Sequence, residues 1–373
     1  MSTQPCLLIM AGGTGGHIFP GLAVAKHASA NGWHVVWMGN PSGMEALLVE
    51  KESLSFEAVS FSALRGKGVA RAMYLPVNLF RACRQAWKVL RRVRPDVVLG
   101  MGGYTSFPGA LVSLLLRIPL VIHEQNSVPG LSNRWLSLFA GRVLCAFPKA
   151  IWRGIWVGNP IRQEIADIPP PAKRYACRNG VLRLLVVGGS QGSAALNETI
   201  PAGLAMILED LRPTVVHQAG EQHIEQLSHK YQALNISAIC EAFIDDIPQR
   251  YAWADLVICR AGASTIAELT AAGVPAVLVP FPYAVDDHQT SNARFMSKSG
   301  AAFFMPQSQL TPDAIASLTR LERSQLLNMA KIARSLARPQ ASASVLEHCA
   351  SLLAKRGSAD AVKTAEPEQE HEA

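Results

Sequence analysis

The chain has 373 residues, of which 49% are hydrophobic and 17% are charged. Such a composition is typical of a globular protein of about two domains, and it excludes disordered, collagen-like and coiled-coil chains. The seven cysteines are scattered and never closer than nineteen positions, so we expect neither a disulfide framework nor a CxxC metal or redox site. With a strand-like start at Cys6–Met10 and no signal-peptide pattern, the chain is expected to be cytoplasmic.

The net charge of +7 belongs to the first half of the chain. Up to Arg162 there are 17 basic and 6 acidic residues, whereas the remainder has 18 basic and 22 acidic residues. Nine of the cations lie between Leu64 and Arg94, where no acidic residue occurs. This segment is more basic than a typical solvated helix face.

From Pro76 to Val93 the residue spacing predicts a helix with two unlike faces. One stripe is apolar and should face the core: Leu79, Cys83, Ala86, Leu90 and Val93. The other side mixes aromatic rings with cations: Phe80, Arg81, Arg84, Trp87, Lys88 and Arg91. Its rings either pack under a neighbouring loop or contact a partner. An anionic membrane surface fits the mixture better than nucleic acid, because rings insert among headgroups and each cation adds about 1 kcal/mol. No zinc-finger or RNP-like motif favours nucleic acid.

Short apolar strand candidates alternate with helical patterns along the whole chain. They are Leu7–Met10, Val35–Met38, Val97–Leu99, Leu120–Ile122, Leu184–Val187, Thr214–His217, Leu256–Cys259 and Ala276–Val279. This alternation predicts an α/β protein with parallel sheets and crossover helices. A proline run at Ile168–Pro171, followed by a polar segment, is the best linker candidate, so we expect domains at 1–162 and 163–340. The acidic tail 357–373 lacks apolar periodicity and is predicted to be disordered.

Both halves begin with a strand, a Gly-Gly-hydroxyl-x-Gly turn and a helix. The turns follow Met10 and Val187 and indicate two Rossmann-like domains facing one cleft. Neither turn is a P-loop or a G-x-G-x-x-G motif, and no acidic residue follows the second strand, so hydride transfer with NAD is disfavoured. Glycines at such a junction let backbone amides approach a phosphate closely, although many glycine turns are purely structural.

His17 directly follows the first glycine turn, at the start of a helix that we expect Pro20 to begin. A histidine there can act as a general base near neutral pH, or can simply cap or pack at the helix start. In the second half, Cys259–Glu268 brings an arginine, small residues and a hydroxyl to another strand-to-helix turn. Thr265 and Glu268 have the spacing of a capping box, which does not exclude ligand contact by the same carboxylate.

Eight motifs in order along the chain resemble the MurG family of GT-B glycosyltransferases. They are GGTGGHIFPGLAVA (Gly12–Ala25), GMGGYTSFPG (Gly100–Gly109), HEQN (His123–Asn126), GNPIR (Gly158–Arg162), GGSQGS (Gly188–Ser193), FIDD (Phe243–Asp246), CRAGASTIAE (Cys259–Glu268) and DHQTSNA (Asp287–Ala293). The resemblance implies two Rossmann-like domains, with the donor held mainly by the second and the acceptor entering from the first. It also implies that a last helix at 341–356 packs back on the first domain.

The resemblance further implies an inverting transfer of N-acetylglucosamine from UDP-GlcNAc to the 4-hydroxyl of lipid I, the undecaprenyl-linked muramyl-pentapeptide, which gives lipid II and UDP. Ser190 would bind the diphosphate of the donor, and the backbone of Ile244 would bind its uracil. Glu268 would bind the ribose, and Gln289 would bind the N-acetylglucosamine. Helix-terminus amides would come from the segment Ala263, Ser264, Thr265, Ile266 and Ala267. Thr14, Gly15, Gly16, Asn126 and Arg162 would complete the cleft. His288 precedes Gln289 where the family often has a paired polar motif, so its role stays open.

For the chemistry, His17 is the expected base, with Asn126, Glu124 or a water as alternatives. The sequence has no Asp-x-Asp motif, and we expect no cofactor and no tightly bound metal. Expected partners are UDP-GlcNAc, lipid I and an anionic membrane surface at the cytoplasmic face of the bacterial inner membrane, with cell-wall synthesis proteins as further candidates and no nucleic acid. The rival predictions are a UDP-GlcNAc 2-epimerase or related sugar-nucleotide enzyme, and a non-catalytic nucleotide-binding module.

Overall fold

The fold is known from a computed structural model that describes residues 4–61, 74–189, 191–318 and 320–364. Chain contacts divide it into two compact units. Unit 1 comprises residues 1–125, 129–160 and 340–373, and unit 2 comprises residues 126–128 and 161–339. The expected boundary at 162/163 lies two residues from the observed one at 160/161.

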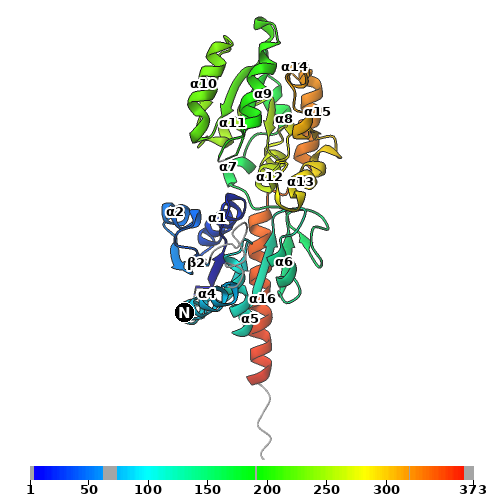
Figure 1. The fold of residues 1–373 in the computed structure, drawn as a ribbon. Coiled ribbons are helices and arrows are strands. Elements are labelled where there is room, and N and C mark those ends of the chain that lie inside the picture. Colours follow the sequence, from blue (N-terminus) through cyan, green and yellow to red (C-terminus); the bar gives the residue numbers. More distant parts are fainter. Residues whose placement is uncertain (1–3, 62–73, 190, 319, 365–373) are drawn as a thin grey trace, which may run out of the picture. The chain divides into compact units, whose positions relative to one another are not determined.

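Unit 1 is a parallel sheet covered by helices on both faces (Figure 1). Its strands are β1 (Cys6–Met10), β2 (His34–Gly39), β3 (Ser55–Ala58), β4 (Val97–Gly100), β5 (Leu120–Glu124), β6 (Arg142–Cys145) and β7 (Ile155–Trp156), in the order β3-β2-β1-β4-β5-β6-β7. Its helices are α1 (Gly15–Ala30), α2 (Met44–Lys51), α4 (Leu75–Val93), α5 (Ser106–Leu115), α6 (Leu131–Leu136) and α16 (Ala341–Thr364).

Side chains alternate across this sheet as the twofold repeat of a strand requires. Leu7 and Ile9 of β1 pack in the cluster that also contains α1 and Val345 of α16, whereas Leu8 and Met10 pack toward α4 and α5. Since both faces are covered, the central strands read as continuous apolar runs.

Unit 2 repeats this design with a second parallel sheet, ordered β10-β9-β8-β11-β12-β13. The strands are β8 (Arg183–Val187), β9 (Thr214–Gln218), β10 (Ala238–Glu241), β11 (Leu256–Cys259), β12 (Ala276–Leu278) and β13 (Ala302–Phe304). The α-helices are α7 (Gln163–Ala166), α8 (Pro171–Tyr175), α9 (Ala194–Ala205), α10 (Ile224–Ala233), α11 (Ile247–Trp253), α12 (Ala263–Ala272), α13 (His288–Ser297), α14 (Pro312–Leu318) and α15 (Arg323–Ser335). Short 3-10 turns occur at Glu209–Leu211, Glu221–His223, Val285–Asp287 and Gln307–Gln309.

In both sheets the chain order reverses beside the first strand, between β1 and β4 and between β8 and β11. Ligands of open α/β sheets bind at such switch points, outside the carboxyl ends of the strands. The fold is thus the predicted pair of Rossmann-like domains, and each domain carries one switch point.

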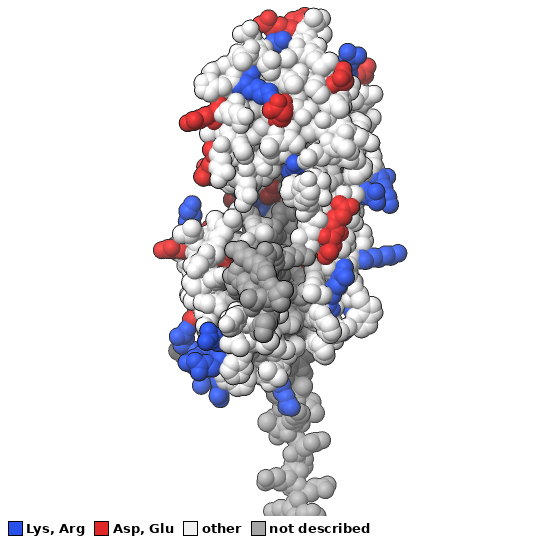
Figure 2. All heavy atoms as spheres, viewed as in Figure 1, with Lys and Arg blue, Asp and Glu red and all other residues white. Residues whose placement is uncertain are grey.

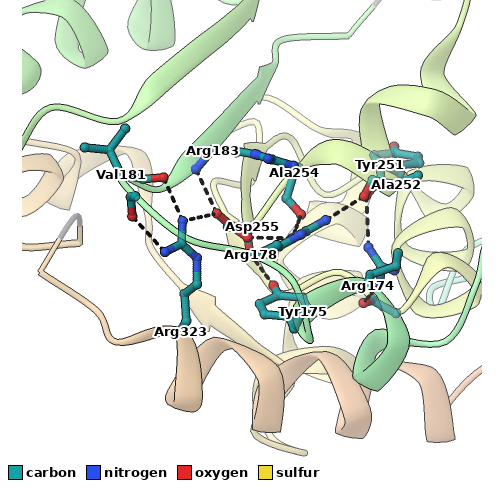
Figure 3. Close-up of polar contacts among 12 residues, drawn as sticks. Arg174, Tyr175, Arg178, Val181, Arg183, Tyr251, Ala252, Ala254, Asp255 and Arg323 are labelled. Carbon is teal, nitrogen blue, oxygen red and sulfur yellow. Dashed lines mark hydrogen bonds and ion pairs between the residues drawn. The ribbon is translucent and has the colours of Figure 1, made fainter.

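The predicted linker is wrong, because the proline run lies inside unit 2 and leads into a packed helix. Pro171 is the first residue of α8, and the residues that follow α8 are anchored by Asp255 at the amino end of β11 (Figure 3). The buried Asp255 carboxylate pairs with Arg178 at 2.5 Å and accepts the Arg183 backbone N–H at 3.0 Å, while Arg323 of α15 lies 3.2 Å away. Tyr175 donates to the Asp255 carbonyl at 2.7 Å.

The C-terminal prediction needs a correction as well. The last helix, expected at 341–356, runs from Ala341 to Thr364 and packs against α1 (Figure 1). Eight residues of the segment predicted to be disordered are therefore helical, and residues 365–373 lie outside the described part. Missing apolar periodicity shows that a segment need not be buried, but it does not prevent intrahelical hydrogen bonds.

Among the described residues, none of the helices has the length and hydrophobicity that crossing a bilayer requires.

Helix α4 presents the predicted mixed face, and its apolar stripe is shifted. The six residues of the mixed face are all exposed: Phe80, Arg81, Arg84, Trp87, Lys88 and Arg91. The buried residues are Ala82, Ala86, Val89 and Leu90, whereas Leu79, Cys83 and Val93 are only half-buried. Ala82 and Ala86 of α4 are buried in one cluster with Ala110 and Val112 of α5, so the line of contact includes small residues that the predicted stripe left out. The cations Arg65, Lys67 and Arg71 lie outside the described residues.

Candidate functional sites

The switch point of unit 1 is formed by two interlocking glycine turns, which follow β1 and β4. Gly103 has a φ of +83°, and a Cβ there would lie 2.2 Å from the carbonyl oxygen of Gly12. The two turns therefore touch backbone to backbone, which only glycine permits at this position. The predicted binding residues Thr14, Gly15 and Gly16 lie at the end of the first turn, where Thr14 is the N-cap of α1 and is exposed.

His17 is the third residue of α1, because the helix begins at Gly15 and not at Pro20 as expected. Its side chain is half-buried, and its Nδ1 atom lies 2.9 Å from Oε1 of Gln125 and 3.1 Å from the Met101 carbonyl oxygen. The buried partners come from the ends of β4 and β5. The imidazole is thus held from one side at the switch point, in a position suited to proton transfer.

A buried carboxylate that the sequence did not reveal accepts a hydrogen bond from the glycine turn after β1. Glu45, in the first turn of α2, is fully buried and accepts the backbone N–H of Asn40 at 3.0 Å and of Gly13 at 3.4 Å. A Cβ on Gly12 would come within 2.3 Å of its Oε1 atom. In the sequence, Glu45 looks like an ordinary acid in a helix's first turn, so no local signal marks it.

The neighbouring residues of the HEQN motif are engaged in the interior of unit 1. His123 is fully buried, its Nε2 lies 2.9 Å from the Gly158 carbonyl oxygen, and burial lowers the pKa of its imidazole to about 4. Glu124, one of the alternative bases, accepts hydrogen bonds from Nδ2 of Asn133 at 2.8 Å and from the Gly130 N–H at 3.2 Å. These contacts give Glu124 a structural role in holding the loop before α6.

Asn126 belongs with unit 2, although it was assigned to the first domain. The reason is Asn292 of α13, which is fully buried and accepts hydrogen bonds from the backbone N–H and the hydroxyl of Ser127 at 3.0 and 2.8 Å. Its Nδ2 atom lies 3.4 Å from Oδ1 of Asn126. Asn292 therefore ties residues 126–128 to unit 2, and the DHQTSNA motif contains it.

At the switch point of unit 2, Arg260 joins the turn after β11 to the turn after β8. Its guanidinium donates at 2.8 Å to Oγ of Ser193, the N-cap of α9, and at 2.8 Å to Oε1 of Gln307. Arg260 also stacks over Phe281, with its Cζ atom 5.5 Å from the ring centre. The predicted diphosphate ligand Ser190 lies outside the described residues.

Helix α12 begins at Ala263 with Gly262 as its N-cap, so the capping-box reading of Thr265 and Glu268 is wrong. The extended backbone of Gly262 starts the helix two residues before Thr265, which leaves Glu268 in the second turn. The first backbone N–H groups of a helix have no intrahelical partner, and they carry partial positive charge. Residues 263–265 therefore offer amides at this end of the sheet. The side chains of Ala263 and Ile266 are buried, whereas those of Ser264, Thr265 and Ala267 are half-buried.

Glu268 accepts a hydrogen bond at 3.1 Å from the hydroxyl of the buried Tyr251, and Arg162 lies 3.8 Å from its other oxygen. Burial raises the pKa of the Glu268 carboxyl, while Arg162 and the Tyr251 hydroxyl act in the opposite direction. The structure thus brings together the predicted residues Arg162 and Glu268, and it adds Tyr251, which no motif marked.

The remaining predicted ligands of unit 2 lie on loops and on α13. Gln289 uses its Oε1 atom to accept the Phe281 N–H at 2.9 Å and the Ala261 N–H at 3.3 Å, so its amide is oriented by the backbone. The Ile244 side chain is buried in the loop after β10. His288 makes a local contact of 2.6 Å with the Val285 carbonyl oxygen at the start of α13.

Across the described ranges, no group of three or more His, Cys, Asp or Glu side chains is placed to hold a metal ion.

Comparisons with known proteins agree with this architecture. The model of the glycosyltransferase family 28 N-terminal domain matches residues 7–145, and that of the C-terminal domain matches residues 183–346. Two parallel sheets with a switch point in each are the fold of a GT-B glycosyltransferase, and a crystal structure of MurG from Acinetobacter baumannii covers 93% of this chain and 99% of its own at a TM-score of 0.80 and 37% identity.

Curated relatives place the chain more narrowly. A protein of Dechloromonas aromatica named UDP-N-acetylglucosamine–N-acetylmuramyl-(pentapeptide) pyrophosphoryl-undecaprenol N-acetylglucosamine transferase is 56% identical over 346 residues, which are 93% of this chain and 98% of the relative. A protein of the same name from Polynucleobacter asymbioticus is 55% identical over 93% of this chain and 98% of its own length. The chain belongs to the MurG family within glycosyltransferase family 28.

The same fold occurs in more distant proteins. A UDP-GlcNAc 2-epimerase from Neisseria meningitidis matches with a TM-score of 0.64 at 12% identity, which shows a shared fold alone. The epimerase alternative is therefore not favoured over the family that matches along the chain.

Proposed function

We propose that the chain transfers N-acetylglucosamine from UDP-GlcNAc to the undecaprenyl-linked muramyl-pentapeptide, lipid I, and releases lipid II and UDP in peptidoglycan synthesis. The observation that carries this proposal is identity above 50%, along almost the entire chain, to enzymes named for that transfer. The residues at the two switch points supply the groups that such a reaction needs.

The donor binds at the switch point of unit 2. Glu268 accepts hydrogen bonds from the ribose hydroxyls, in the orientation that Tyr251 and Arg162 favour. The amides at the start of α12 and the Arg162 side chain face the diphosphate, which is the ligand a helix N-terminus suits best. Ser190 contributes to the same diphosphate, the Ile244 backbone binds uracil, and Gln289 binds the sugar hydroxyls.

The acceptor is activated at the switch point of unit 1. His17 takes the proton of the muramyl 4-hydroxyl as the oxygen attacks the anomeric carbon from the face opposite UDP. The carbon–oxygen bond to UDP breaks as the new bond forms, so the α-linked donor yields a β-1,4 product. The helix amides at α12 stabilise the negative charge that grows on UDP, and no covalent enzyme intermediate is required. Thr14, Gly15, Gly16 and Asn126 contact the reacting sugars.

The proposal includes no cofactor and no tightly bound metal ion. The chain's own cations and helix amides meet the charge of the leaving UDP, and we expect activity to persist in a chelator. Complete loss on chelation, reversed by one particular metal ion, would contradict this part of the proposal.

The basic, aromatic face of α4 holds the enzyme at an anionic membrane, at the cytoplasmic face of the bacterial inner membrane. Figure 2 shows Lys and Arg atoms gathered at the lower left, over the position of α4 in Figure 1. Phe80 is 72% exposed beside these cations, and the guanidinium of Arg91 lies 5.9 Å from the ring centre of the exposed Trp87. Exposed rings and cations on one helix face are the features of an interfacial contact.

Charge reversal tests the membrane contact. Changing Arg81, Arg84 and Lys88 to Glu should weaken binding to vesicles of anionic lipid, most strongly at low salt, and should leave UDP-GlcNAc affinity unchanged. The control reverses three exposed cations of unit 2, Lys173, Lys298 and Arg320. Equal vesicle binding by the two triple variants would remove α4 from the membrane contact.

The test of the transfer itself is UDP release from UDP-GlcNAc, with and without a soluble lipid I analogue, and with the mass of the sugar product measured. Release that requires the acceptor and yields the disaccharide supports the transferase. Conversion of UDP-GlcNAc without acceptor indicates an epimerase or a hydrolase, and no conversion indicates a binding module.

A further inference from the structure

The buried side chain of Gln125 contacts the proposed base, and the HEQN motif by itself gave Gln125 no role. It is 1% exposed, at the end of β5, and it makes two contacts at the switch point. Its Nε2 atom donates to the Met101 carbonyl oxygen at 2.6 Å, and its Oε1 atom lies 2.9 Å from Nδ1 of His17. The Met101 carbonyl oxygen in turn lies 3.1 Å from the same Nδ1 atom.

These contacts determine which nitrogen of His17 carries a proton. The Met101 carbonyl oxygen can only accept, so the Gln125 amide must turn its NH₂ toward Met101 and its oxygen toward His17. A flipped amide would place two oxygens together. Nδ1 of His17 therefore faces two acceptors, and it must be the protonated nitrogen of the neutral ring.

The opposite nitrogen is then free to accept a proton. In the Nδ1–H form of imidazole, the lone pair is on Nε2. No hydrogen-bond partner for Nε2 occurs among the described residues. An unprotonated Nε2 that is directed away from the buried partners is the atom that can take a proton from a hydroxyl.

The backbone around His17 leaves room for this contact. Gly102 has a φ of +89°, and a Cβ at this position would lie 2.9 Å from Nδ1 of His17 and 3.3 Å from Oε1 of Gln125. Any larger residue would crowd the contact that sets the tautomer. The glycine pair after β4 thus has a second purpose beyond its contact with Gly12.

We propose that Gln125 is a positioning residue that holds His17 in the Nδ1–H tautomer, so that Nε2 accepts the proton of the acceptor hydroxyl. The inference rests on the proposed function for its catalytic consequence. An amide in this place orients the ring without adding a negative charge beside it, unlike the carboxylate of a Ser-His-Asp triad.

The test combines a spectroscopic readout with kinetics on the full-length protein. Nitrogen-15 NMR with labelled histidine distinguishes a protonated from an unprotonated ring nitrogen, and the His17 signals are assigned by their loss in His17→Ala. The wild type should show protonated Nδ1 and unprotonated Nε2. Gln125→Met leaves only the longer Met101 contact and should give a mixture of tautomers, whereas Gln125→Glu keeps an acceptor and should restore the Nδ1–H form.

Kinetics should follow the tautomer. We expect kcat of Gln125→Met to fall about tenfold or more, with the 10²–10⁴-fold that a general base contributes as the upper limit. The KM for UDP-GlcNAc should be unchanged, and kcat should be partly restored in Gln125→Glu. Asn133→Leu is the matched control, since it removes another buried amide of unit 1, which contacts the His123 carbonyl oxygen and Glu124. It should leave the His17 signals as they are in the wild type.

The outcomes separate this inference from the proposed function. A protonated Nε2 in the wild type, or an unchanged tautomer and kcat in Gln125→Met, would overturn the role of Gln125. Failure of the wild type to transfer the sugar would instead overturn the proposed function, and the NMR result would still decide the tautomer.

Discussion

The two units have the same sheet order and the same glycine turn after their first strand, yet their switch points carry different chemistry. In unit 1, the turn leads to His17, whose partners are a buried amide and a backbone carbonyl. In unit 2, Arg260 donates to the N-cap of the corresponding helix, and a half-buried Glu268 lies nearby on α12. One architecture thus places an imidazole at the switch point of one unit and a guanidinium with a carboxylate in the other, and the roles we propose for the two units follow these side chains and not the shared fold.

Among the predicted changes, His17→Ala should have the largest effect, and it tests whether the two units have separate roles. It should lower kcat by about 10²–10⁴-fold while UDP-GlcNAc affinity is retained, because the proposed base is in unit 1 and the proposed donor-binding groups are in unit 2. Steady-state kinetics and donor titration measure the two quantities. His27→Ala, at the other end of α1, is the control. A loss below tenfold with an intact fold would move the base to Asn126 or a water.

Asp255→Ala should affect stability rather than chemistry. The change leaves the guanidinium of Arg178 buried without its carboxylate, and breaking a buried pair in this way costs about 3–5 kcal/mol of unfolding free energy. Urea unfolding measures the loss. The exposed Asp313 of unit 2 provides the control, since Asp313→Ala removes a carboxylate without a buried partner. Similar unfolding curves for the two variants would show that Asp255 does not anchor the segment after α8.

Each unit contains a buried histidine that should make the unfolding free energy depend on pH. Burial lowers the pKa of His123 to about 4 and that of His217 to about 3, from an ordinary value of 6.5. The unfolded chain takes up a proton below pH 6.5 and the folded chain does not, so stability is full above that pH. The contribution of His123 to the unfolding free energy therefore falls by on the order of 3 kcal/mol as the pH drops toward 4.

The variant His123→Gln keeps a donor for the Gly158 carbonyl oxygen and removes this titration. Its unfolding free energy, measured between pH 7.5 and pH 4, should depend less on pH than that of the wild type. Equal pH slopes would mean that His123 is protonated in the folded state.

Glu268→Gln should give the smallest effect and should be confined to unit 2. Because hydrogen bonds to a charged group contribute about 1.5–3 kcal/mol, we expect KM for UDP-GlcNAc to rise about tenfold or more, with little change in kcat. Glu241→Gln, which removes the carboxylate paired with Arg250, is the matched control. A fall in kcat at unchanged KM would place Glu268 in the chemical step.

The central strands were predictable, and the edge strands were not. All eight strand candidates correspond to observed strands, and most are buried on both faces and therefore continuously apolar. The strands that were missed, β3, β6, β7, β10 and β13, lie at or next to sheet edges. The four edge strands β3, β7, β10 and β13 are short and partly exposed, so their apolar runs are brief or interrupted. Strand β6 is buried at Val143–Cys145, but its apolar run is only three residues long.

The site residues divide in a similar way. Motifs located His17, Arg162 and Glu268, since the glycine turns and the strand-to-helix junctions are local patterns. Glu45 and Gln125 were missed, because they meet the first glycine turn from 32 and 108 residues away. No local signal marks Glu45, whereas Gln125 lies within the HEQN motif, which does not show by itself that the Gln125 side chain reaches His17.

The sequence by itself determined the two parallel sheets, the glycine turns and the family, because periodicity, backbone freedom at glycine and ordered motifs are properties of the chain alone. Only the tertiary structure decided which atoms contact Nδ1 of His17, and so supplied the basis for the tautomer we propose. It also decided why residues 126–128 belong to unit 2 and that the proline segment is anchored by Asp255. Each of these depends on contacts between residues far apart in sequence, and burial makes such contacts matter, since a buried polar group without a partner is costly.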